Sequence, residues 1–252
     1  MTDNYFALSA VYDTLNADLD YKAWAAYIDG QIKAYSDIPV SLVLDLCCGT
    51  GTMTVELDAL GYDMTGVDLS PDMLQIAREK AAAAGRAENM LFLCQDMCDF
   101  ELYGTVQAVV SCLDSLNHLD GKADLKQVFS LVHNYLEPGG LFLFDMNSPY
   151  KFENIYGTNA YVLEEEGIYC GWQNAYDPKT HVCDFYTTVF TENEDGSYTR
   201  RDDYEREYCF TQKEVETLLA KCGFSVIAVH GDIDGTGVKK DTERLYFVAK
   251  RV

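Results

Sequence analysis

Residues 42–51 read Leu-Val-Leu-Asp-Leu-Cys-Cys-Gly-Thr-Gly, and this stretch constrains the fold more than any other. Its first five residues are almost all apolar, as in a strand that is buried on both faces of a parallel sheet. A turn with Gly49 and Gly51 follows, and a helical pattern begins at Thr52. Strand, Gly-rich turn and helix open the nucleotide-binding α/β folds, whose ligands bind at the carboxyl ends of strands. Asp45 is therefore predicted to lie near a ligand.

The pattern of that first unit is repeated along the chain. Further apolar segments predict strands, and helical patterns separate them; the strands are 62–67, 90–94, 106–111 and 141–144, and the helices are 52–60, 70–85 and 122–136. Residues 137–140 are predicted to form a turn. This alternation predicts a doubly wound, mostly parallel sheet of the Rossmann-like type. Two final strands, 224–230 and 244–250, raise the number to seven. The loop between them is too short for a crossover helix, so an antiparallel hairpin is expected.

The character of the sequence changes between residues 150 and 208. Segments 168–175, 181–191 and 198–210 are rich in Tyr, Phe, Thr and Val and are separated by turn residues. Such segments are typical of antiparallel strands. We therefore expect residues 1–149 and 209–252 to form a cofactor-binding domain and residues 150–208 to form an antiparallel β insertion that caps the substrate.

Residues 1–38 precede the first strand and show two helical patterns, at 5–15 and 21–32. Their aromatic residues Tyr12, Tyr21 and Trp24 allow two interpretations. The rings can belong to the core, or they can form a helical lid over a bound ligand, because this segment must cross the edge or the top of the sheet.

Composition excludes several classes of function. The formal net charge of −22 argues against a nucleic-acid partner or an anionic membrane surface, both of which require a basic footprint. No apolar segment approaches the roughly 20 residues of a transmembrane helix, and the first residues do not resemble a signal peptide. The nine cysteines do not follow zinc-site spacing. We expect a cytoplasmic protein with reduced thiols, without a bound metal.

Three kinds of ligand are known for a Gly-rich turn of this type. A phosphate-binding loop requires Lys followed by Ser or Thr, which are missing here. A dinucleotide site requires a third glycine, but Thr54 stands at that position, and Asp45 would repel a pyrophosphate. A cationic nucleoside without phosphates remains, and S-adenosylmethionine has that chemistry.

Acidic residues after successive strands suggest how such a ligand is held. Asp45 would act near its ammonium group, Asp68 would accept hydrogen bonds from the ribose hydroxyls, and Asp96 would accept one from the adenine amino group. Apolar contacts to adenine would come from Leu69, Met73 and Met97. For Asp68 an alternative is that it only caps the following helix, although Ser70 already fits that role.

Four motifs in this order resemble the class I S-adenosylmethionine-dependent methyltransferases that act on small molecules. The motifs are Asp45–Gly51, Gly66–Ser70, Cys94–Met97 and Leu136–Gly140. The resemblance covers residues 40–148 and extends to members with an antiparallel insertion after the fifth strand. It departs at Cys48, where many relatives have Gly or Ala. It implies cofactor contacts from the turn and from other segments: Tyr12, Tyr21, Trp24, Cys47, Cys48, Gly49, Thr50, Gly51, Cys112, Leu113 and Asn117.

Methyl transfer requires alignment and a dry site more than a particular catalytic group. A base is needed only if the acceptor must first lose a proton, and Asp114 or His118 could serve; otherwise His118 is a polar wall of the pocket. Asn147 is predicted to face the same crevice. Tyr169 and Trp172 could line the acceptor pocket or pack within the insertion.

Two other functions remain open at this point. One is a non-catalytic protein that binds S-adenosylmethionine or S-adenosylhomocysteine, and the other is a nicotinamide oxidoreductase. The acidity of the chain favours a neutral or cationic acceptor, such as an amine.

Overall fold

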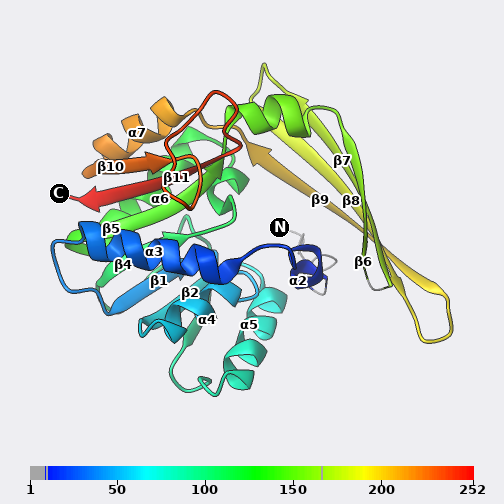
Figure 1. The fold of residues 1–252 in the computed structure, drawn as a ribbon, viewed down its shortest axis with the longest axis horizontal. Coiled ribbons are helices and arrows are strands. Elements are labelled where there is room, and N and C mark those ends of the chain that lie inside the picture. The colour runs from blue at the N-terminus through cyan, green and yellow to red at the C-terminus, as the bar shows by residue number, and fades with distance from the viewer. Residues whose placement is uncertain (1–8, 10, 166) are drawn as a thin grey trace.

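A seven-stranded sheet forms the centre of the protein, with strand order β10-β11-β5-β4-β1-β2-β3 (Figure 1). The computed structural model describes Ser9 and residues 11–165 and 167–252. The strands are β1 (Leu42–Leu46), β2 (Asp63–Asp68), β3 (Leu91–Cys94), β4 (Val106–Ser111), β5 (Leu136–Asn147), β10 (Phe224–His230) and β11 (Arg244–Arg251). Strands β1 to β5 are parallel, and β11 is antiparallel to both β5 and β10. The predicted doubly wound sheet with a C-terminal antiparallel hairpin is confirmed.

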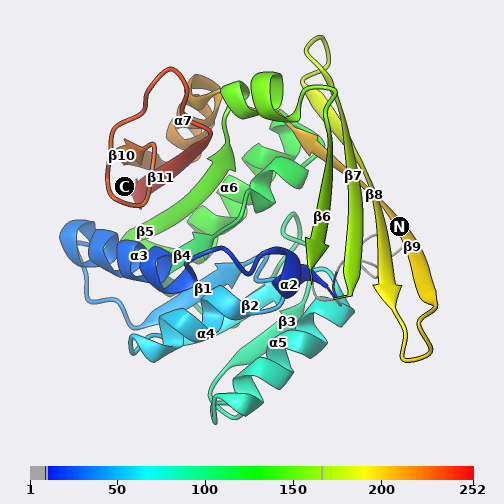
Figure 2. The same cartoon turned by 45° about the vertical axis from the view of Figure 1, so that its right-hand side comes forward.

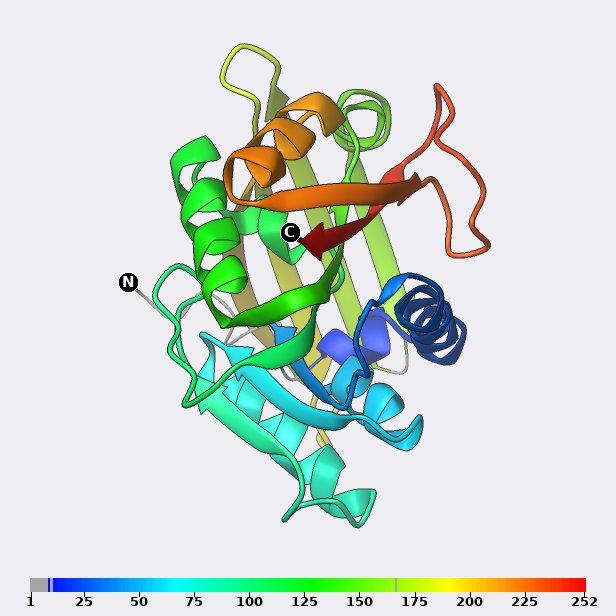
Figure 3. The same ribbon diagram turned by 90° about the vertical axis from the view of Figure 1, so that its left-hand side faces the viewer.

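Helices cover both faces of this sheet, because its strands are apolar on both sides. The helices are α2 (Tyr12–Leu15), α3 (Tyr21–Tyr35), α4 (Thr52–Ala59), α5 (Pro71–Ala83), α6 (Lys122–Tyr135) and α7 (Gln212–Lys221), with a short 3₁₀ helix η1 (Ser115–His118). Apolar residues of α3 and α4 pack on one face, and those of α6 and α7 pack on the other. Figure 3 shows α3 and α6 on opposite sides of the sheet.

The helices begin where the sequence predicts. Ser70 accepts a hydrogen bond from the N–H of Met73, with Pro71 at the first helical position of α5. Thr211 and Glu214 form a capping box at α7. Asp20 caps α3. The pattern predicted for 5–15 is described only in part: α2 is helical, while residues 5–8 and 10 lie outside the described residues.

A second sheet stands beside the first, and we call it the cap sheet (Figures 1 and 2). It follows the π-helix η2 (Lys151–Tyr156) and consists of the antiparallel strands β6 (Ala160–Glu165), β7 (Ile168–Asp177), β8 (Val182–Glu192) and β9 (Tyr198–Tyr208). One face, the inner face, packs Cys170 and Val189 against Val11 beside α2. The register places Asp203, Glu205 and Glu207 of β9 on this inner face as well.

Two elements differ from the prediction. Residues 137–140 belong to β5 instead of forming a separate turn, because the pairing with β4 shifts between Val106 and Ala108 and the extra residues bulge out of the strand. Strand β6 was not predicted. Most of its residues are exposed, so no apolar alternation marks it in the sequence.

No helix among the described residues is both long enough and apolar enough to cross a bilayer.

Candidate functional site

A hollow of about 350 Å³ lies at the carboxyl ends of β1 and β4, beside the Gly-rich turn. It is lined by residues from α2, α3, the turn after β1, the start of α4 and the loop after β4: Tyr12, Tyr21, Asp45, Cys47, Cys48, Gly49, Thr50, Thr52, Met53, Cys112, Leu113 and Ser115. Since the carboxyl ends of parallel strands meet at one edge, segments far apart in sequence converge here.

The Gly-rich turn is held by the end of β2. The backbone is left-handed at Gly49 and at Gly51, where φ is +53° and +73°. The carboxylate of Asp68 accepts hydrogen bonds from the N–H of Gly49 at 2.8 Å and from the N–H of Ser70 at 2.9 Å. Burial raises the pKa of Asp68 above its ordinary value, although these two hydrogen bonds lower it. A carboxylate has about four acceptor positions, so Asp68 retains capacity for further donors.

Asp45 is a buried acid at the same edge. Its side chain is 1% exposed, and Oδ2 accepts a hydrogen bond from the hydroxyl of Thr54 at 2.5 Å. Burial raises the pKa of Asp45 to about 7, against the effect of the Thr54 hydrogen bond. The charged form of Asp45 therefore lacks full compensation from the described residues, and a ligand with a positive group would supply it.

An acidic residue of α2 fastens the N-terminal segment to the turn. Asp13 accepts a hydrogen bond from the hydroxyl of Thr50 at 2.7 Å and forms an ion pair with Lys80 of α5 at 2.7 Å. Lys80 also donates to Thr50 and Thr52. These contacts hold Tyr12 against the hollow, where burial raises the pKa of its hydroxyl well above the ordinary value.

Arg244 of β11 organises the other side of the hollow. Its guanidinium pairs with Asp114 at 2.7 Å and also with Asp145 of β5, and it lies over the ring of Trp24. Asp145 in turn accepts hydrogen bonds from the N–H groups of Leu113 and Asp114 at 2.8 and 2.9 Å. Burial raises the pKa of Asp114, but the positive charges of Arg244, Lys151 and His118 together outweigh burial and keep that pKa below its ordinary value. The loop after β4 is thus fixed by buried charge pairs.

The buried side-chain amides of Asn117 and Asn147 join the domain of the central sheet to the cap sheet. Asn117 donates to the carbonyl of Tyr208 at 2.9 Å and accepts from the N–H of Asn147 at 3.0 Å. Asn147 donates to Glu207 at 3.0 Å and accepts from Lys151 at 3.0 Å. Burial, and secondarily the charge of Asp114, raises the pKa of Glu207 to about 8. The amide groups of both asparagines are therefore used within the protein.

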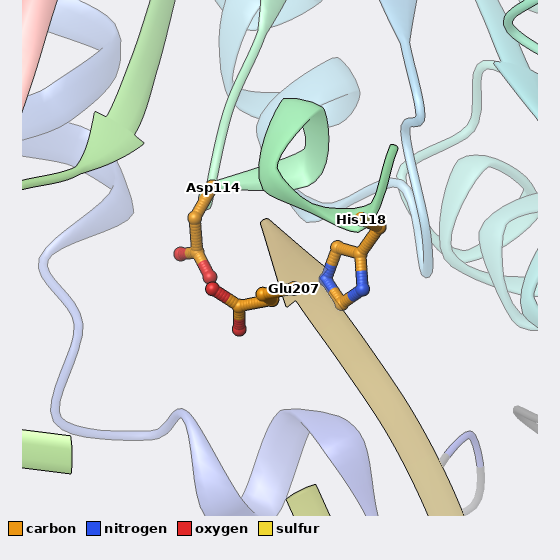
Figure 4. Close-up of side chains that lie close together, drawn as sticks. All are labelled: Asp114, His118 and Glu207. Carbon is orange, nitrogen blue, oxygen red and sulfur yellow. The ribbon is translucent and has the colours of Figure 1, made fainter. Parts of the chain in front are cut away.

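Asp114, His118 and Glu207 point toward one another where β9 meets η1 (Figure 4). One ligand atom from each lies within 4.8 Å of the others, a spacing that can hold a cation. However, Arg244 already neutralises Asp114, and Asn147 already donates to Glu207. These partners argue for a polar junction between the domain and the cap sheet more than for a metal centre.

Most of the residues predicted to contact a cofactor surround the hollow. The lining includes Tyr12, Tyr21, Asp45, Cys47, Cys48, Gly49, Thr50, Cys112 and Leu113. Asp68 accepts a hydrogen bond from the turn at Gly49, and Gly51 is the N-cap of α4. Met97 lies beside Cys47, with 3.6 Å between the two sulfur atoms. Asp96 accepts from the N–H of Cys98 in the loop after β3, Leu69 is 58% exposed, and Met73 is buried in α5.

The other predicted residues lie elsewhere. Trp24 packs edge-on against Tyr246 and borders a smaller neighbouring hollow, so the core interpretation fits its position. Trp172 is on the inner face of the cap sheet, but Tyr169 is 42% exposed on the outer face. Sequence reasoning missed Asp13, Lys80, Arg244, Asp145 and the acids of β9. The alternation of acids at 203, 205 and 207 was the one visible signal for the last group.

Comparisons with known proteins agree with this site. A family profile described as a methyltransferase domain matches residues 43–140. A protein from Geobacillus sp. (strain WCH70) that is named a putative methyltransferase is 31% identical over 98% of this chain and 99% of its own length. The crystal structure of an S-adenosylmethionine-dependent methyltransferase from Clostridium acetobutylicum ATCC 824 has a TM-score of 0.88 and 28% identity, covering 98% of each chain. A dTDP-3-amino-3,4,6-trideoxy-alpha-D-glucopyranose N,N-dimethyltransferase from Streptomyces venezuelae is 27% identical over 90% of this chain and 94% of its own.

Proposed function

Because this chain belongs to the S-adenosylmethionine-dependent methyltransferases, we propose that it methylates a small molecule held between the hollow and the inner face of the cap sheet. The cofactor supplies an activated methyl group on a sulfonium. The protein then has to bind the two substrates, align them and exclude water. The named activity of the amino-sugar relative supports a small-molecule acceptor.

The observation that carries the proposed cofactor site is the convergence of Asp68, Asp45 and the Gly-rich turn. Asp68 has spare acceptor capacity beside the turn, as a ribose requires. At Gly49 an added Cβ would meet no atom within 4 Å, so this turn borders open space. Asp45 lacks a cationic partner among the described residues. A cationic nucleoside fits all three features.

The remaining side chains have supporting roles in this proposal. Tyr12 and Tyr21 close the hollow from the N-terminal side, and Cys112 and Leu113 form its wall after β4. We assign Asp96 and Met97 to the adenine end, because the loop after β3 lies next to Cys47 of the turn. Asn117 and Asn147 position the cap sheet through Tyr208 and Glu207.

The test combines binding with turnover. Titration calorimetry with S-adenosylhomocysteine should give one site per chain. Asp68→Ala should weaken it by roughly 1–3 kcal/mol, the usual cost of orphaned hydrogen bonds. Asp63→Asn, at the opposite end of β2, is the matched control and should leave affinity unchanged. Formation of S-adenosylhomocysteine from S-adenosylmethionine with added small molecules would distinguish the enzyme from a binding protein, for which binding would persist without turnover.

A further inference from the structure

We propose that the methyl acceptor is an amine that enters as its ammonium ion and is held by Glu205 and Asp203 on the inner face of β9. This inference rests on the proposed function and names the chemical class of its acceptor. It follows from where β9 directs its acids, from their hydrogen bonding and from the groups around them.

The acidic residues of β9 lie on both faces of the strand. Successive side chains of a strand point to opposite sides, so Asp203, Glu205 and Glu207 share one face and Asp202 lies on the other. Glu205 pairs with Phe185 and Glu207 pairs with Cys183, two residues that are buried against η2. The three acids therefore face the methyltransferase domain.

The acids on the two faces of the cap sheet differ in their hydrogen-bond partners. On the outer face, Asp202 binds Arg200 and accepts from Thr188, and Asp184 binds Arg206 and Tyr204. On the inner face, one carboxylate oxygen of Glu205 and one of Asp203 are buried and accept no hydrogen bond within the described part of the chain. Burying a carboxylate without a partner is costly, so these oxygens are suited to a donor from outside the chain.

Two cations near these acids, Arg244 and Lys151, are already engaged. Arg244 is bound by Asp114 and Asp145, and Lys151 donates to Asn147 and lies over the ring of Tyr156. Burial raises the pKa of Glu205 to about 7, and the nearby charge of His118 lowers it only in part. Arg201 also lies on the inner face, two residues before Asp203, and His118 lies near Glu205. Even so, one buried oxygen of Glu205 and one of Asp203 receive no hydrogen bond from any described residue.

The same region offers a surface for the organic part of an amine. Trp172, Phe185 and Tyr156 form an aromatic cluster beside Glu205, with the Trp172 and Phe185 rings 5.9 Å apart. The indole N–H of Trp172 is buried and has no acceptor among the described residues. Aromatic rings next to carboxylates are a common way to bind organic cations.

These acids also lie next to the cofactor hollow. Glu207, on the same face of β9, has a carboxylate oxygen within 4.8 Å of ligand atoms of Asp114 and His118, and Leu113 and Ser115, on either side of Asp114, line that hollow. A nitrogen bound at Glu205 would therefore be close to the place proposed for the methyl group.

In the proposed reaction, a methyl group passes from S-adenosylmethionine to the amine, and Glu205 accepts a proton. The ammonium first loses a proton to the carboxylate of Glu205, which leaves a nitrogen lone pair. That lone pair forms the N–C bond, while the C–S bond breaks and its electron pair stays on sulfur. The product is a methylated ammonium ion and S-adenosylhomocysteine, with one proton transferred from the substrate to Glu205 and then to solvent.

The first experiment uses charge to sort the unknown acceptor. A small-molecule extract of the organism that encodes this chain is divided on a cation exchanger at neutral pH. Each fraction is incubated with the intact protein and methyl-deuterated S-adenosylmethionine, and labelled products are identified by mass spectrometry. We expect the label on nitrogen, in the retained fraction only. A labelled oxygen or carbon acceptor in the unretained fraction would overturn the inference and leave the proposed function intact. Labelling in neither fraction would instead contradict the proposed function.

The second experiment tests the residues with the retained acceptor. Glu205→Gln keeps the shape and removes the charge and the proton acceptor, so it should raise KM at least about tenfold and lower kcat, while the affinity for S-adenosylhomocysteine stays the same. Asp203→Asn should act in the same direction and serves if the first variant folds poorly. Asp202→Asn, on the outer face of the same strand, should leave KM unchanged. An unchanged KM in both inner-face variants would overturn the assignment.

Discussion

The hydroxyl of Thr54 donates a 2.5 Å hydrogen bond to the buried carboxylate of Asp45. In the sequence, Thr54 occupies the position at which a dinucleotide fingerprint would have its third glycine. The structure gives a reason for a threonine at this position, because the buried acid at the end of β1 needs a hydrogen-bond donor from α4. Thr54 therefore breaks the dinucleotide fingerprint and also stabilises Asp45, the acid that suits a cationic ligand.

Thr54→Val should destabilise the protein by roughly 1–3 kcal/mol, since a buried acceptor loses its donor while the packing volume is retained. Urea denaturation measures the effect. In the background of Asp45→Asn the cost should be smaller, because an amide leaves no charge to compensate. Equal losses in both backgrounds would show that packing, and not the hydrogen bond, explains the effect.

Cofactor binding should release a proton near neutral pH. The pKa of Asp45 is raised to about 7, so the free protein holds a proton there below that pH, and a nearby ligand cation favours the carboxylate. Affinity for S-adenosylmethionine should therefore increase as pH rises through about 7. Calorimetry in buffers of different ionisation enthalpy measures the proton release. Asp45→Asn should reduce it, and a variant that releases as much as the wild type would assign the proton to another group.

Asp13→Asn should accelerate dissociation of the cofactor. Asp13 connects α2 to Thr50 and Lys80, and it is partly exposed, so its contribution is small, roughly 0.5–1 kcal/mol or a factor of two to five. Stopped-flow displacement of bound S-adenosylhomocysteine measures the rate. Asp18→Asn, just beyond α2, serves as the control. A rate that is the same in all three proteins would mean that α2 does not retain the cofactor.

Alanine substitutions at the two glycines of the turn should differ in effect, one acting mainly on stability and the other mainly on cofactor binding. At Gly51 an added Cβ would lie 2.8 Å from the Cβ of Ala77, so Gly51→Ala should destabilise the fold through both the clash and the left-handed backbone. At Gly49 no atom is near, so Gly49→Ala should cost only about 1–2 kcal/mol of backbone strain and mainly weaken cofactor binding. Thermal unfolding and calorimetry distinguish the two effects, and the opposite ranking would contradict the geometry.

The sequence predicted the parts of the protein that depend on local patterns. Apolar runs located the strands of the central sheet, and Ser70 and Thr211 located helix starts, because capping uses neighbouring residues. Strand β6 was missed because its residues are mostly exposed. The Arg244–Asp145 pair joins residues 99 positions apart, and no local pattern encodes such a partnership. The side on which Tyr169 lies depended likewise on strand register in the cap sheet.

The most direct test of the account is a crystal structure of the protein with S-adenosylhomocysteine. We predict that the ligand fills the hollow beside Gly49, with its ribose hydroxyls donating to the carboxylate of Asp68 and its amino acid end near Asp45. A ribose that makes no contact with Asp68, or a ligand bound outside this hollow, would contradict the account.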